Sequence, residues 1–228
     1  MPSENRAKEE MRLWGEYKGS HEIKYPSETV VRYLNNNFPT GKGKKILDFG
    51  CGTGRNALVM AEMQFDIYVA DYNDVCIERT KEKMENINYR NVTYIKNERL
   101  KIPIESDELD CIVAWGSLFY CNAEDRKLLF SELNRVLKVG GCFLGDFRTK
   151  EDYLYGKGEE IENDYFILNE YLPGINYWFC DEEAISELYK EHGFEIVNLE
   201  KEDFYRYNMQ RKNSHYHVWA KKEKNCYV

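Results

Sequence analysis

The chain has 228 residues, of which 43% are hydrophobic, 14% aromatic and 32% charged. Its length suits one domain with a full core, and this composition is typical of globular rather than disordered proteins. Its 40 acidic residues outnumber its 32 Lys and Arg, which gives a net charge of −8. Because duplex binding depends on clustered Lys and Arg, this charge argues against a broad nucleic-acid surface, although not against one local site.

Two further features bear on the cellular compartment. The longest apolar run, residues 111–115, is too short to cross a bilayer, and the charged start at residues 1–6 lacks the apolar core of a signal peptide. The seven Cys include no C-x-x-C pair. We therefore expect a cytoplasmic protein without membrane association, disulfides or structural zinc.

Strands and helices alternate along the first two thirds of the chain. Charged residues 3–17 predict a helix, and a second helix follows Ser27 as its N-cap. Such alternation predicts a parallel sheet with right-handed crossovers and helices on both faces. The expected strands are 45–49, 66–70, 91–95, 109–115 and 142–146. The expected helices between them are 55–64, 73–86 and one capped by Asn122 that is stopped by Gly140-Gly141.

The pattern changes after residue 150. Eight aromatic residues lie within residues 151–180 without a regular period. A helix follows over 181–192, and two last strands are expected at 194–199 and 215–220. Because no helix separates these two strands, we expect them to pair antiparallel.

The most informative segment is Leu47-Asp48-Phe49-Gly50-Cys51-Gly52-Thr53-Gly54, where the first strand meets the first helix. A glycine-rich turn at this place lets the backbone approach a bound nucleotide closely. The third Gly falls one residue earlier than in the dinucleotide fingerprint G-x-G-x-x-G, and Arg55 stands where that fingerprint has a small residue. Both differences count against a pyrophosphate ligand.

Five features in register make the chain resemble the class I S-adenosylmethionine-dependent methyltransferases, firmly over residues 40–145. They are the Asp48-x-Gly50-x-Gly52-x-Gly54 turn, Asp71 at the end of the second strand, Glu98 five residues before Pro103, the strand 110–115, and the helix-to-strand segment 135–141. The resemblance implies an α/β fold with a doubly wound, Rossmann-like sheet of seven strands. That sheet would be mostly parallel with a C-terminal antiparallel strand and helices on both faces.

The resemblance also implies S-adenosyl-L-methionine as cofactor, S-adenosyl-L-homocysteine as product, and no metal. In the family, the acid at Asp71 binds the ribose hydroxyls and the acid at Glu98 binds the adenine amine. Glu98 is longer than the family's usual Asp, so the backbone of Arg99 or Leu100 is an alternative adenine contact. Trp115 either lines the pocket or packs in the core. The implied cofactor-binding residues are Tyr17, Asp48, Gly50, Cys51, Gly52, Asp71, Tyr72, Glu98, Arg99 and Trp115.

The acceptor is less constrained by the sequence. No Asp-Pro-Pro-Tyr or Asn-Pro-Pro-Tyr follows the fourth strand, and no Pro-Cys pair occurs, so amide-methylating and cytosine-methylating enzymes are disfavoured. We expect methyl transfer to N or O of a small molecule, and an acidic chain favours a cationic one. The alternatives are a tRNA or protein methyltransferase, or a nucleotide-binding Rossmann protein that is an oxidoreductase or is not catalytic.

Two segments are expected to close the site: an N-terminal helical segment at 1–40, and a substrate cap at 147–180 within a methyltransferase domain at 41–228. Methyl transfer to an alcohol or ammonium requires removal of a proton. The candidate catalytic residues are Tyr17, Asp146 and His215. Asp146 ends the fifth strand, where it either accepts this proton or caps the following turn. His217 shares a face with His215 because side chains alternate along a strand.

Overall fold

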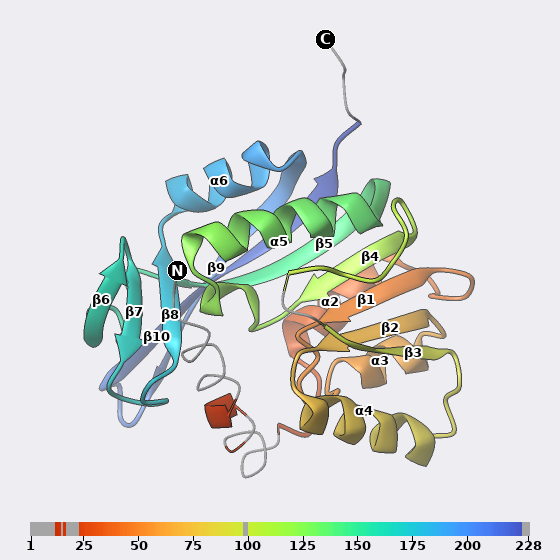
Figure 1. Cartoon of the computed structure of the whole chain (residues 1–228), viewed down its shortest axis with the longest axis horizontal. Helices are drawn as coiled ribbons and strands as arrows, with labels where there is room; N and C mark the ends of the chain where they lie inside the picture. Colours follow the sequence, from red (N-terminus) through yellow and green to blue (C-terminus); the bar gives the residue numbers. More distant parts are fainter. Residues whose placement is uncertain (1–11, 15, 17–22, 98–99, 225–228) are drawn as a thin grey trace.

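The structure, a computed structural model, describes residues 12–14, 16, 23–97 and 100–224. The sheet has ten strands rather than the seven expected from the sequence. Seven of them, which we call the main sheet, lie in the order β3-β2-β1-β4-β5-β10-β9 (Figure 1), and the other three extend from the end of β5. β1 to β5 run parallel, whereas β10 runs antiparallel to both β5 and β9. This arrangement confirms the Rossmann-like sheet expected from the sequence. The strands are β1 (Lys45–Phe49), β2 (Asp66–Asp71), β3 (Val92–Lys96), β4 (Leu109–Ala114), β5 (Leu137–Thr149), β9 (Phe194–Arg206) and β10 (Arg211–Lys222).

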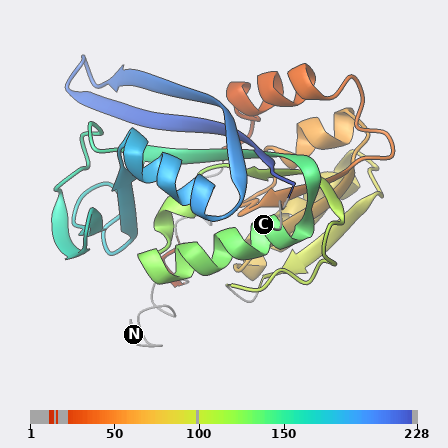
Figure 2. The same ribbon diagram turned by 90° about the horizontal axis from the view of Figure 1, so that it is seen from above.

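Helices cover both faces of this sheet (Figure 2). They are α2 (Glu28–Asn37), α3 (Ala57–Glu62), α4 (Asp74–Asn86), the short 3-10 helix η1 (Leu118–Tyr120), α5 (Ala123–Val136) and α6 (Glu182–Glu191). Neighbouring strand residues serve opposite faces: Ile46 joins the apolar cluster of α2, α3 and α4, whereas Leu47 joins that of α5 and α6. Burial on both faces explains why the central strands are continuously apolar.

Side-chain caps set the starts of three helices. The Oδ1 of Asn73 accepts a hydrogen bond from the backbone N–H of Val75 at 2.9 Å at the start of α4. The Oδ1 of Asn122 accepts a hydrogen bond from the backbone N–H of Asp125 at 2.8 Å, which confirms Asn122 as the N-cap of α5. The Oδ1 of Asp181 accepts one from Ala184 at 2.9 Å at the start of α6. α2 begins after Ser27 as predicted, but the Ser27 side chain forms no capping hydrogen bond.

The predicted end of α5 at Gly140-Gly141 is wrong. The helix ends at Val136, and Leu137 already pairs with Leu109 as the first residue of β5. The pairing register then shifts before Cys111 and Cys142, and Gly140 adopts a φ of +76° within this irregularity. The glycines therefore accommodate a bulge inside the strand rather than a helix terminus.

The segment between β5 and α6 forms three antiparallel strands of its own, β6 (Gly158–Glu162), β7 (Tyr165–Leu168) and β8 (Asn176–Cys180). β8 joins the main sheet only at the end of β5, through Arg148 and Thr149. Many aromatic side chains of the segment between β5 and α6 pack into a third apolar cluster with Trp14 and Phe119. The aromatic residues without a helical period thus belong to strands and loops.

The last two strands form an antiparallel hairpin, as predicted, but a longer one than the sequence suggests. It extends to Arg206 and Arg211, and its far end lies near β6 to β8 (Figures 1 and 2). Most of the predicted helix at 3–17 lies outside the described residues. Within the part of the chain that the structure describes, no helix has the length and apolar character to cross a membrane.

Candidate functional site

The glycine turn after β1 is held in a conformation that few other residues adopt. Gly50, Gly52 and Gly54 have φ values of +69°, +55° and +76°. A Cβ on Gly50 would lie 2.4 Å from the Cβ of Ser117, which follows β4. The turn therefore presents its backbone at the carboxyl ends of the parallel strands, where open α/β sheets bind ligands.

Asp71 fixes this turn to the end of β2. Its Oδ2 accepts a hydrogen bond from the N–H of Gly52 at 2.9 Å, and its Oδ1 accepts one from the N–H of Asn73 at 2.9 Å. Its backbone oxygen accepts a hydrogen bond from Asn97, at the end of β3, at 2.9 Å. Asp71 is 9% exposed and therefore organises the turn from beneath.

Asp48 lies deeper, at 1% exposure. Burial raises its pKa to about 7, and the charge of Asp71 acts in the same direction, whereas Arg55 and a backbone hydrogen bond from Ala57 act against it. Its Oδ2 has no hydrogen-bond partner among the described residues. A buried carboxyl oxygen without a donor is costly, so Asp48 is suited to receive a cationic or hydrogen-bonding group.

One cavity of about 350 Å³ joins the glycine turn to the end of β5. Its lining includes Gly50–Thr53, Trp115 after β4, Asp146 on β5, and residues of the hairpin β9–β10. This volume is in the usual range of small-molecule sites. The glycine turn and the residues beside β5 and β10 therefore border the same space.

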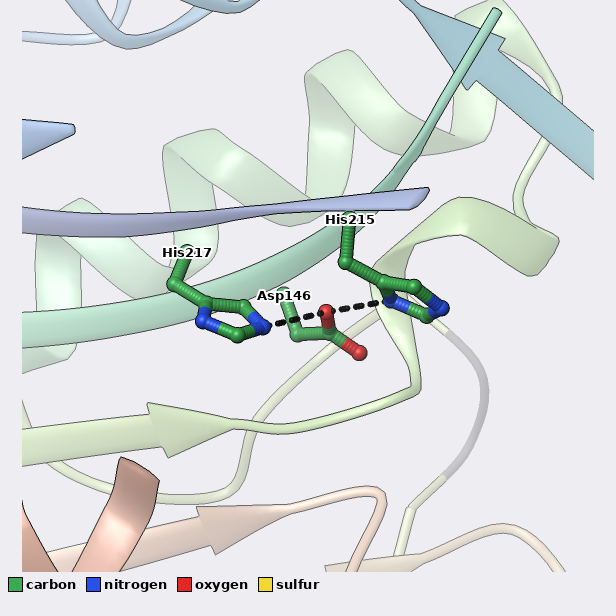
Figure 3. A group of neighbouring side chains, drawn as sticks. All are labelled: Asp146, His215 and His217. Carbon is green, nitrogen blue, oxygen red and sulfur yellow. Dashed lines mark hydrogen bonds and ion pairs between the residues drawn. The ribbon is translucent and has the colours of Figure 1, made fainter. Parts of the chain in front are cut away.

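Asp146, His215 and His217 converge in the second half of the cavity (Figure 3). Asp146 lies between the two imidazole rings, with Oδ1 2.8 Å from Nδ1 of His215 and 3.7 Å from Nε2 of His217. The sheet explains this convergence, because β10 pairs with β5 and places His217 opposite Asp146. Phe204 stacks on His215, and Trp115 lies 4.7 Å from His217 between ring centres.

Burial and the neighbouring charges shift the pKa values of Asp146 and His217 in opposite directions. Burial tends to raise the pKa of Asp146, but the charge and hydrogen bond of His215, with His217 and Arg148, outweigh it and lower that pKa. Burial lowers the pKa of His217 against the charges of Asp146 and Glu202. Asp146 is thus a carboxylate near neutral pH, and His217 is a neutral imidazole.

The same three side chains could hold a metal ion, because their ligand atoms all lie within 4.8 Å of one another. Two imidazoles and one carboxylate suit zinc or iron. However, Arg55 and Arg148 place positive charge near Asp146, and this charge would repel a dication. The absence of a metal requirement, expected from the sequence, stays a prediction.

The residues expected to bind the cofactor fall into three groups. Gly50, Cys51, Gly52 and Trp115 line the cavity, as do the candidate catalytic residues Asp146 and His215. Asp48 and Asp71 lie beneath the turn, and Tyr72 packs against the third apolar cluster. Tyr17, Glu98 and Arg99 lie outside the described residues. The roles assigned to all of them stay predictions.

Several lining residues are not predicted from the sequence, namely Arg148, Glu202, Phe204, Arg206 and Arg211. For Arg211 the signal is the two-residue alternation along β10, because Arg211, Asn213, His215 and His217 all line the cavity. Glu202, Phe204 and Arg206 alternate in the same way along β9. The alternation becomes visible only once β9 and β10 are known to extend to Arg206 and Arg211.

Comparison with known proteins identifies relatives. A family model described as a methyltransferase domain matches residues 46–141. The ubiquinone/menaquinone biosynthesis C-methyltransferase UbiE of Campylobacter jejuni is 30% identical over 190 residues, which cover 72% of this chain and 75% of that protein. A tRNA N(3)-cytidine methyltransferase of Xenopus tropicalis is 22% identical over 203 residues, which cover 84% of this chain and 59% of that protein.

Solved structures share the fold. A SAM-dependent methyltransferase from Methanosarcina mazei superimposes with a TM-score of 0.72 at 17% identity, covering 83% of this chain and 97% of that one. Several curated relatives are longer proteins: the matches with three of them span 41%, 59% and 53% of their lengths. The chain thus spans about half the length of those relatives.

Proposed function

Because the chain belongs to the class I S-adenosylmethionine-dependent methyltransferases, we propose that it transfers the methyl group of S-adenosylmethionine to a nitrogen or oxygen atom of a small molecule. The observation that carries this proposal is the single cavity that joins the glycine turn to Asp146 and His215. A donor site and an acceptor site must adjoin for a direct displacement, because the nucleophile has to be aligned with the methyl carbon.

The residues around the turn fit the cofactor. Asp48 has a buried Oδ2 without a donor, which a methionyl ammonium would supply. The backbone of Gly50 and Gly52 lines the cavity, and Asp71 beneath it holds the N–H of Gly52 in place. When bound, S-adenosylmethionine supplies a methyl carbon activated by a sulfonium.

The residues of this chain that would act on the acceptor lie in the second half of the cavity, beside β5 and β10. When Nδ1 of His215 donates its hydrogen to Oδ1 of Asp146, Nε2 keeps a lone pair that can accept a proton. Asp146 then orients the ring and stabilises the imidazolium that forms. In this role His215 is the general base, and Asp146 is a positioning residue unless an acceptor reaches its own free oxygen.

Residues from two segments form walls of the cavity around this pair. Trp14, from the described part of the N-terminal segment, lines the cavity, as do Tyr153, Tyr171 and Leu172 of the segment 147–180. We propose that both segments close over the acceptor, as the sequence suggests. Exclusion of water strengthens the hydrogen bonds and charges that align the nucleophile.

A second candidate is methylation of an aromatic carbon. The relative from Campylobacter jejuni is named a C-methyltransferase and aligns with most of the chain. A phenolic acceptor would also need a base to remove its proton, so the same His215–Asp146 pair would serve. Carbon and heteroatom methylation are distinguished by the methylated product rather than by the site.

The test uses S-adenosylmethionine with an isotopically labelled methyl group. The purified chain is incubated with a fractionated small-molecule extract, with tRNA and with protein, in separate reactions. We expect label only in the small-molecule fraction, and mass spectrometry then identifies the methylated atom. Label in tRNA or protein alone would contradict the small-molecule assignment.

A further inference from the structure

The inner face of the hairpin β9–β10 forms one wall of the cavity. Side chains alternate along its strands, so Glu202, Phe204 and Arg206 of β9, and Arg211, Asn213, His215 and His217 of β10, all line the cavity. Going outward from His217, this wall ends at Arg206 and Arg211, which we call the distal arginine pair. These two residues are direct partners across the hairpin.

The distal arginine pair brings two positive charges face to face. Like charges directly opposite on paired strands are unfavourable. Among the described residues, neither arginine forms an ion pair with a carboxylate; their contacts are with aromatic rings. Arg206 lies 5.2 Å from the ring centre of Phe204, and Arg211 lies 4.8 Å from that of Tyr207 and 5.3 Å from that of Tyr153.

The outer face of the same hairpin is arranged differently. Lys201 and Lys212 are both paired with Glu151, and Lys212 also lies 2.9 Å from Asp203. Lys201 and Lys212 are therefore neutralised on the outer face, whereas the exposed Arg206 and Arg211 at the distal end of the cavity have no counter-charge among the described residues. This local excess is opposite to the net charge of −8 of the whole chain.

Arg148 extends the positive charge toward the reacting groups. It is 8% exposed, lines the cavity, and lies opposite His215 in the strand pairing. Its Nη1 donates to Asp152 at 2.7 Å, whereas its buried Nε has no partner. Burial tends to lower the pKa of Arg148, but Asp152 and neighbouring groups outweigh it and raise that pKa, so Arg148 stays charged.

We propose that the methyl acceptor carries a phosphate group, and that the distal arginine pair binds it while the nucleophilic atom lies beside His215. This inference rests on the proposed function, because it assigns the group to the acceptor of that reaction. A guanidinium stacked on a ring keeps its N–H edge free for two-point hydrogen bonding to a phosphate. A phosphate between Arg206 and Arg211 would also remove the repulsion between them.

The spacing suits an extended acceptor. His215 and Arg211 are four residues apart on β10, which corresponds to roughly 13 Å along a strand. The long arginine side chains shorten the distance that the acceptor must span. The acidic chain suggests a cationic acceptor, but the charges that line the distal part of this cavity favour an anion.

The test measures anion binding by calorimetry at constant ionic strength, with pyrophosphate and acetate as probes. Each is titrated into the full chain, both free and loaded with S-adenosylhomocysteine. We expect pyrophosphate to bind at least about tenfold more tightly than acetate, because charged hydrogen bonds to several guanidinium groups favour the multiply charged anion. Equal affinity for the two probes would overturn the phosphate assignment in favour of a carboxylate.

The variants locate the binding. The double variant Arg206→Ala/Arg211→Ala should bind pyrophosphate at least about tenfold more weakly. The matched control Lys201→Gln/Lys212→Gln removes two charges from the outer face and should leave pyrophosphate affinity within about twofold. Equal losses in both variants, or none in the arginine variant, would overturn the proposal.

S-adenosylhomocysteine separates this proposal from the proposed function. Its affinity should be the same within about twofold in the wild-type chain and in both variants, because neither variant changes the glycine turn. If it does not bind the wild-type chain, the proposed function fails. The titrations of the free protein then still decide whether the distal arginine pair binds phosphate.

Discussion

Asp48 is a carboxyl group whose proton should respond to the cofactor. Its pKa of about 7 comes chiefly from burial, and its Oδ2 has no donor. A ligand ammonium favours the charged carboxylate and would lower this pKa. We therefore expect S-adenosylhomocysteine binding at about pH 6.5 to release protons, measured as a binding enthalpy that changes with the ionisation enthalpy of the buffer.

The control for this experiment is Asp48→Asn, which keeps the shape and removes the titration. It should abolish the dependence on the buffer, and a dependence that persists would place the ammonium elsewhere. The variant has a second consequence. Because the folded pKa lies above the ordinary 3.8, the contribution of Asp48 to stability is lost as the pH rises from 3.8 through about 7. Asp48→Asn should remove this loss.

Asp71 should matter for stability as well as for cofactor affinity. The sequence alone predicts that Asp71→Ala weakens S-adenosylmethionine binding by about 2 kcal/mol with little effect on stability. In the structure its carboxylate accepts hydrogen bonds from Gly52 and Asn73. Loss of both acceptors should cost a further ~1–3 kcal/mol of unfolding free energy, which thermal unfolding would detect. Asp71→Asn, which keeps one acceptor oxygen, should lie between Asp71→Ala and the wild type.

Asp146 and His215 should affect turnover rather than cofactor binding. Asp146→Asn preserves the shape but removes the charge that orients His215 and stabilises its protonated form. We expect turnover to fall by about 10²-fold or more, with S-adenosylhomocysteine affinity unchanged. Full turnover by this variant would mean that the acceptor is neutral and needs alignment only.

The glycine turn can be tested with a matched pair of substitutions. Gly50 and Gly43 have nearly equal φ values of +69° and +72°, but a Cβ would clash with Ser117 only at Gly50. Gly43→Ala should therefore cost about 1–2 kcal/mol of stability through its backbone alone and leave cofactor affinity unchanged. Gly50→Ala should cost more and weaken S-adenosylhomocysteine binding, as measured by calorimetry. Equal effects of Gly50→Ala and Gly43→Ala on S-adenosylhomocysteine affinity would show that cofactor binding does not depend on the shape of this turn.

Elements with a clear apolar pattern are predictable from the sequence. The strands β1 to β4 start and end within a residue or two of their predicted limits, because continuous apolar runs bounded by turn residues mark buried parallel strands. The sequence predicts too short a hairpin because the outer half of the hairpin is largely polar on both faces. Its charged inner residues, such as Arg206 and Arg211, face a cavity rather than a core, and hydrophobic alternation therefore fails there.

The candidate site divides in the same way. The turn at Gly50 and the acid at Asp71 follow directly from local sequence, since a tight strand-to-helix turn requires glycine. The pairing of Asp146 with His217, two residues about 70 positions apart in the chain, is set by the register between β5 and β10. No local pattern carries that register, and the arginines of the distal wall depend on it too.

At the scale of the whole molecule, the candidate site draws on several strands that are adjacent only in the folded sheet. Asp48 comes from β1, Asp71 from β2, Trp115 follows β4 and Asp146 comes from β5. A ligand that needs this arrangement binds the folded chain and not the unfolded one, and it must stabilise the fold by mass action. At about 100 times its dissociation constant, S-adenosylhomocysteine should add about 2.7 kcal/mol. For a chain of this length, this should raise the unfolding temperature by roughly 5–10 °C.

NAD should leave the unfolding temperature unchanged in the same scan. Gly54 falls one residue too early for the dinucleotide fingerprint, and Arg55, which replaces its small residue, lines the cavity beside the turn. A pyrophosphate seated on the turn would need the close helix–strand approach that this side chain prevents. Stabilisation by NAD, with none by S-adenosylhomocysteine, would contradict the cofactor assignment while leaving the Rossmann-like sheet intact. Stabilisation by S-adenosylhomocysteine alone would mean that the altered glycine spacing, and not the shared fold, selects the ligand.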